Sequence, residues 1–179
     1  QGIIVVGDLD VKRIENKIIE MFSSIEMPAN APERIYYPVE DNKGTIYAIG
    51  KDKEQSNAII EIMFKQDAMP DSLKGSMEYM IYNYATSMIT SMLDSRLNDM
   101  MSKPDAPFAM ASSSYGEFFV AKTKDAFTVS GIAKGNDIKP VLEAIYREVL
   151  RAQRGGFTAT EYERARSEYL SRLETAYKN

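Results

Sequence analysis

The chain has 179 residues, 44% of them hydrophobic and 27% charged, as in an ordinary globular protein. A net charge of −4 argues against nucleic acid as a partner, and no apolar run reaches the ~20 residues that a membrane-spanning helix needs. The sequence contains neither histidine nor cysteine. It therefore lacks the commonest zinc ligands, thiol chemistry and every Ser-His or Cys-His pair, so we predict no metal site and no catalytic residue in this chain.

The N-terminal part of the chain predicts a strand, a helix and a loop. Residues 3–6 are a short run of β-branched side chains, which is typical of a central strand. Since the chain opens directly into this strand, we expect it to be a piece of a longer protein. Asp10 is a good N-cap for a helix over residues 11–22, whose apolar side chains recur at helical spacing. Three prolines within residues 23–38 then indicate a loop.

The middle of the chain is expected to be organised around one long helix. Strands are predicted before it, at residues 45–49 and 57–65. The helix should begin after a cap at Asp71 or Ser72 and end before Pro104, because the residue before a proline is disfavoured in the α region. At about 30 residues it would be roughly 45 Å long, enough to lie across a whole sheet. Its apolar face has steps of three and four residues and consists of Leu73, Met77, Met80, Ile81, Tyr84, Met88, Met92, Leu93, Leu97, Met100 and Met101.

Three further strands are predicted after the long helix. They cover residues 106–115, 117–123 and 126–133. Lys124 and Asp125 lie between the last two and are expected to form a hairpin turn.

Two helices complete the predicted chain. The first is capped by Asn136 or Asp137 and ends near Arg154, before two glycines that are typical of helix C-termini. Thr158 and Glu161 form a capping box that opens the last helix, where Glu161 is otherwise expected to be a surface charge. The element order is therefore β-α-β-β-α-β-β-β-α-α. Because strands come in consecutive groups, we predict an α+β domain with a mostly antiparallel sheet and helices layered on one face.

Four stretches of the sequence resemble insulinase/pitrilysin-like zinc peptidases. Two lie at the ends of the chain: the run from Val5 to Asp10 followed by a helix, and the Gly156-Phe157-Thr158 run with Glu161, which is similar to a C-terminal helix motif of the family. The other two are Asp94-Ser95-Arg96-Leu97, which looks like the family's "SRL" element, and Lys103-Pro104-Asp105-Ala106-Pro107-Phe108, which is similar to Bacteroides-type bacterial members. The resemblance implies a metallopeptidase-like domain of the mitochondrial-processing-peptidase type.

The resemblance also implies which part of such a protein this chain represents. In the family, α+β domains occur in pairs, and the first domain carries the zinc motif His-x-x-Glu-His, which is absent here. An Arg and a Tyr that assist catalysis also have no counterpart after the "SRL" element, since Met100-Met101-Ser102-Lys103 follows it and Tyr115 is too far along. Residues 1–179 are therefore expected to be a single non-catalytic domain that is not an enzyme by itself. The missing Arg and Tyr imply that it is the second domain of the N-terminal half and not the fourth domain that helps catalysis. The resemblance places zinc in a missing catalytic domain of the same parent chain, and suggests a periplasmic or exported protein.

One segment could still bind peptide. In the insulinase-like pattern, the strand after the Lys-Pro-Asp break lies at a sheet edge that faces the closed chamber, where an extended peptide can pair with it. Carried over to this sequence, the strand consists of Phe108, Ala109, Met110, Ala111, Ser112, Ser113 and Ser114. Small side chains there would let a substrate backbone approach closely. The alternative is that they pack beneath a neighbouring helix or loop.

Other functions are open at this point. The parent chain could be a structural or assembly module of the same fold without protease activity, or the domain could be an unrelated α+β domain that binds a small ligand. Asp8 and Asp10 could be read as a metal pair, but turn and capping roles explain them better. The methionines of the long helix are expected to be core residues rather than a pliable binding face.

Overall fold

The computed structural model describes residues 2–26 and 29–178. The chain divides into two compact units, Gln1–Ile35 and Tyr36–Asn179. The first unit contains α1 (Val11–Phe22), as predicted, with the Arg13 N–H donating to the Asp10 carboxylate at 3.1 Å. The predicted strand at residues 3–6 is wrong, because no described segment pairs with it and an isolated strand leaves its backbone groups without partners.

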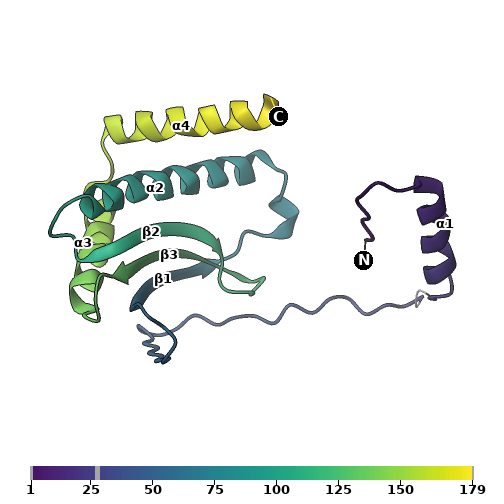
Figure 1. The fold of residues 1–179 in the computed structure, drawn as a ribbon, viewed down its shortest axis with the longest axis horizontal. Helices are drawn as coiled ribbons and strands as arrows, with labels where there is room; N and C mark the ends of the chain where they lie inside the picture. Colours follow the sequence, from purple (N-terminus) through teal and green to yellow (C-terminus); the bar gives the residue numbers. More distant parts are fainter. Residues whose placement is uncertain (1, 27–28, 179) are drawn as a thin grey trace. The chain divides into compact units, whose positions relative to one another are not determined.

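The second unit is built on a three-stranded antiparallel sheet with the order β1-β3-β2 (Figure 1). β1 (Ile59–Asp67) and β2 (Phe108–Glu117) both pair with β3 (Lys124–Ala133), which therefore lies in the centre. The register runs from Phe108 opposite Ala133 to Glu117 opposite Asp125, with an irregularity after Phe108. The prediction of an antiparallel α+β domain is confirmed.

The long helix is α2 (Met77–Met101), and it begins later than predicted. A 3₁₀ turn, Asp71–Leu73, precedes it, and Gly75 then adopts a φ of +89°, a conformation that excludes a continuous helix. Ser76 is the actual cap, since its hydroxyl accepts a hydrogen bond from the Tyr79 N–H at 3.2 Å. The buried residues of α2 lie in its middle and C-terminal turns: Met88, Met92, Leu93 and Leu97.

Two more helices follow the sheet, α3 (Lys139–Gly155) packed on it and α4 (Ala159–Lys178) packed on α2. Both follow the predicted ranges closely, and both arms of the capping box are present. In Figure 1, α2 lies between the sheet and α4. The main core is closed by α2, α3 and one face of the sheet, and contains Leu93, Leu97, Phe108, Ala111, Val129, Ala133, Val141 and Ile145.

Two further predicted strands are not found. Residues 45–49 contain no strand, and residues 118–123 form the loop between β2 and β3. Lys124 and Asp125 are consequently the first residues of β3 rather than a turn. Charged residues are tolerated at this strand end because the Lys124 amine lies 2.6 Å from the carboxylates of both Asp41 and Asp67.

Candidate functional site

The seven residues predicted to bind peptide all lie on β2, which is an outer strand of the sheet. Their side chains alternate between two faces. Phe108, Ala111 and Ser113 are buried against the helices, so for them the packing alternative describes the structure. The exposed ones are Ala109, Met110, Ser112 and Ser114. Of the seven, these four side chains are accessible to a partner, and the register irregularity after Phe108 is why the neighbours Ala109 and Met110 are both exposed.

The outer edge of β2 also offers backbone groups. The Ser113 N–H points away from β3, because it donates to Oδ1 of Asp94 at 2.5 Å. Alternation in an antiparallel strand places the N–H groups of Ala111 and Tyr115 on the same edge. Of these three donors, the middle one is therefore already paired with a side chain of α2.

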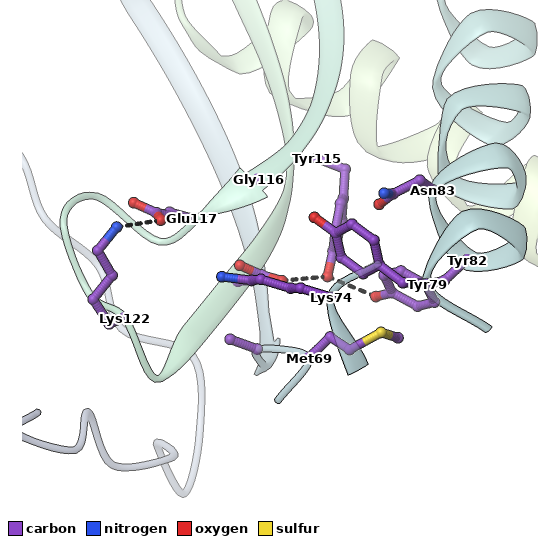
Figure 2. A pocket seen from close by; sticks show the side chains of 11 residues that line it. Met69, Lys74, Tyr79, Tyr82, Asn83, Tyr115, Gly116, Glu117 and Lys122 are labelled. Carbon is purple, nitrogen blue, oxygen red and sulfur yellow. Dashed lines mark hydrogen bonds and ion pairs between the residues drawn. The ribbon is translucent and has the colours of Figure 1, made fainter. Parts of the chain in front are cut away.

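The strand ends at a hydrogen-bonded cluster around Tyr115, which Figure 2 shows. The Tyr115 hydroxyl donates to the Asp125 carboxylate at 2.9 Å and accepts from the Gln66 amide at 2.6 Å. The Tyr82 hydroxyl lies 2.6 Å away and must donate to Tyr115, since the single Tyr115 proton is used by Asp125. Burial, together with the Tyr82 and Asp125 bonds, raises the pKa of Tyr115. Its hydroxyl stays protonated at neutral pH and offers no base.

A hollow of about 230 Å³ lies beside this cluster at the end of β2 (Figure 2). Two ion pairs border it: Lys74 with Asp71 at 2.6 Å, and Lys122 with Glu117 at 2.5 Å. Its remaining lining includes Tyr79, Tyr82, Asn83, Tyr115 and Gly116. The hollow is thus bordered by charged groups of both signs, with Ala68 and Met69 as apolar parts of its lining.

The "SRL" and C-terminal helix elements lie in contact with each other. The Arg96 guanidinium donates two hydrogen bonds to the Glu161 carboxylate, at 2.5 and 2.9 Å, and another to the Gly156 carbonyl at 2.9 Å. It also lies 3.3 Å from the Glu148 carboxylate and 4.5 Å from the centre of the Phe157 ring. The hydrogen bond from Arg96 lowers the pKa of Glu161 to about 2. Glu161 is thus an internal ion-pair partner, not only a capping residue on the surface.

Sequence reasoning missed the contact between Asp94 and Ser113 and the cluster around Tyr115. In the sequence, Asp94 stands out only as part of a family-like motif. Its partner Ser113 lies 19 positions away, so no local pattern connects the two residues. The apolar spacing predicted a long helix in this region, but it starts later than expected, and Met77 and Met80, expected in the core, are exposed. Within residues 2–26 and 29–178, no group of three or more acidic side chains is arranged to hold a metal ion. Asp10 acts as the cap of α1.

The fold and this site define a class: an α+β domain whose antiparallel sheet has helices on one face and an outer strand beside a polar hollow. The chain belongs to the family described as the Peptidase M16 inactive domain, because the model of that family matches residues 3–169. This confirms the resemblance to insulinase-like peptidases. No curated protein sequence matches the chain.

Two crystal structures of the periplasmic protease PqqL from Escherichia coli have a similar fold. The first half of PqqL matches with a TM-score of 0.71 at 20% identity, over 95% of this chain and 35% of that one. The whole protease matches with a TM-score of 0.71 at 19% identity, over 95% of this chain and 18% of that one. This chain thus spans only a minor part of either protein. No helix among the described residues is both long and apolar enough to cross a bilayer.

Proposed function

We propose that this chain is the non-catalytic domain of a zinc endopeptidase, where it forms part of the chamber wall and holds extended peptide along the outer edge of β2. Membership of the inactive-domain family supports the first part. The observation that carries the second is that, among residues 2–26 and 29–178, β2 pairs with β3 on one side and with no strand on the other. An outer strand of this kind can accept a further strand through main-chain hydrogen bonds.

Zinc does not fit this chain. The sequence has no histidine or cysteine, and the described acidic side chains form no metal-binding group. In our proposal the metal is held by a catalytic domain of the same parent chain, which is the domain's principal partner. We place the parent protein in the periplasm or outside the cell, by analogy with the protease of similar fold.

The hollow at the end of β2 extends the proposed peptide site. A peptide that pairs with the strand continues past Tyr115 towards Gly116 and Glu117, which border the hollow. Since successive residues of an extended chain point to opposite faces, every second peptide side chain is directed the same way. One of them is proposed to enter the hollow, while its neighbours lie over Ser112 and Ser114.

An NMR titration with an unstructured peptide of about ten residues tests the proposal, because that length adds one strand to a sheet. We expect amide shifts to concentrate in β2, and residues of the other outer strand, β1, to remain unchanged. A peptide of the same sequence with N-methylated amides is the control, since it cannot donate main-chain hydrogen bonds and should not bind. If neither peptide shifts any β2 amide, the strand is not a binding edge and a purely structural domain is the better conclusion.

A further inference from the structure

We propose that Asp94 is a gate on the outer edge of β2: its carboxylate occupies the middle of the edge and must leave before a peptide can pair along the whole strand. This inference rests on the function proposed above and concerns the regulation of the same site. It identifies a residue of α2, outside the strand itself, as the determinant of how much of the strand a peptide can use.

The contact joins one carboxylate oxygen to two donors on Ser113. Oδ1 of Asp94 accepts from the Ser113 N–H at 2.5 Å and from the Ser113 hydroxyl at 2.8 Å. The same hydroxyl lies 3.2 Å from the carbonyl of Thr90, one helical turn earlier in α2. Ser113 is only 9% exposed, so this arrangement is largely shielded from water. Three short contacts therefore hold the middle of β2 against α2.

The strength of this contact explains why it excludes a peptide. A peptide strand would present a neutral carbonyl to the Ser113 N–H, whereas Asp94 presents a charged oxygen. Hydrogen bonds to ionised acceptors are roughly twice as strong as neutral ones. A carbonyl from an incoming strand therefore competes poorly with Asp94 at this position.

Blocking one donor divides the edge into two short parts. Adjacent outward donors on the same strand belong to Ala111 and Tyr115, on either side of Ser113. With Asp94 in place, a peptide can pair only on one side at a time, and the Tyr115 side is the one that leads to the hollow. Proteins commonly protect outer strands with charged side chains, since a free edge invites unwanted pairing. In this domain the protecting charge also lies within the proposed peptide site.

The variant Asp94→Ala tests whether the contact between Asp94 and Ser113 limits peptide binding or only stabilises the fold. The same NMR titration measures peptide affinity in the wild-type chain, in Asp94→Ala and in Asp99→Asn, a control on the exposed side of the same helix. We expect Asp94→Ala to bind about tenfold more tightly, because one charge-assisted hydrogen bond no longer has to be broken. Its peptide-induced shifts should extend through Ser113, and Asp99→Asn should behave as wild type.

Equal or weaker binding by Asp94→Ala than by the wild type overturns the gate while leaving the peptide site in place. If no protein binds, including Asp94→Ala, both the gate and the proposed function are overturned. Asp94→Asn covers the case in which alanine prevents folding, since asparagine keeps the shape but offers a neutral acceptor, and it should also bind more tightly than wild type. Hydrogen exchange of the Ser113 amide gives a readout without peptide: it should accelerate in the Asp94 variants and remain slow in Asp99→Asn.

Discussion

At the scale of single residues, Arg96 connects two of the family-like motifs. Its guanidinium joins the "SRL" element of α2 to Glu161 and Gly156 at the start of α4. These residues are 60 or more positions away in the sequence, yet both motifs serve one ion-paired contact. In this structure the two motifs therefore hold α2 and the start of α4 in contact with each other.

The Glu161 carboxylate should make stability depend on acid pH. Its pKa is about 2 in the folded chain, against an ordinary value of 4.5, because Arg96 stabilises the charged form. A depressed pKa stabilises the folded state above about pH 4.5, and that contribution is lost as the pH falls towards 2. We expect Glu161→Gln to lower the free energy of unfolding by about 2 kcal/mol at pH 6. The difference from wild type should shrink steadily between pH 5 and pH 2 in urea titrations.

Glu163→Gln is the matched control for this prediction. Glu163 lies on the same helix but is exposed, and its ion pair with Arg166 is long, at 3.5 Å. Exposed pairs contribute little, so its curve should follow wild type at each pH. A constant gap between Glu161→Gln and wild type down to pH 2 would mean that the Arg96 contact does not depend on the charge of Glu161.

At the scale of elements, local patterns predicted the helices better than the strands. α1, α3 and α4 lie close to their expected ranges, because caps and apolar spacing are local features. Strands need partners, and three of the six predicted runs have none in the described residues. The start of β3 was also not predictable, because the charges of Lys124 and Asp125 suggest a turn. Only the structure shows that Asp41 and Asp67 lie beside the Lys124 amine.

Gly131 sets the spacing between β3 and α3. A Cβ atom at this position would lie 2.6 Å from Cγ1 of Val141, too close for any packed pair of atoms. We expect Gly131→Ala to cost about 1–3 kcal/mol in the free energy of unfolding, because the helix must move away from the sheet. Urea denaturation measures the change.

Gly135→Ala provides the comparison for Gly131. An added Cβ there meets nothing within 4 Å, so the change in stability should stay within about 0.5 kcal/mol. Equal losses for the two variants would show that the cost comes from the backbone of the glycines and not from crowding by Val141.

At the scale of the whole molecule, the buried side chains of the described residues all belong to one unit. Both core clusters draw their buried residues from Met88–Ala165, inside Tyr36–Asn179, and α1 has no buried residue. The family match nevertheless extends over residues 3–169 and so includes residues of both units. The N-terminal segment is thus part of the family match but contributes no buried residue to the two core clusters.

A chain shortened to residues 36–179 should therefore fold cooperatively. It retains every buried residue of the two core clusters, and we expect its midpoint of thermal unfolding to stay within about 4 °C of the full chain. Circular dichroism with heating measures both midpoints. Loss of a cooperative transition would show that Gln1–Ile35 contributes to the core.

The sequence by itself determined which residue types this chain lacks and where most of its helices lie. The absence of histidine and cysteine is a matter of composition, and capping or helical periodicity depends on residues within a few positions of each other. Tertiary structure alone decided that Asp94 meets Ser113, that Arg96 meets Glu161, and that β2 is an outer strand. Those contacts join residues 19 and 65 positions apart, and chain folding, not local propensity, brings such residues together.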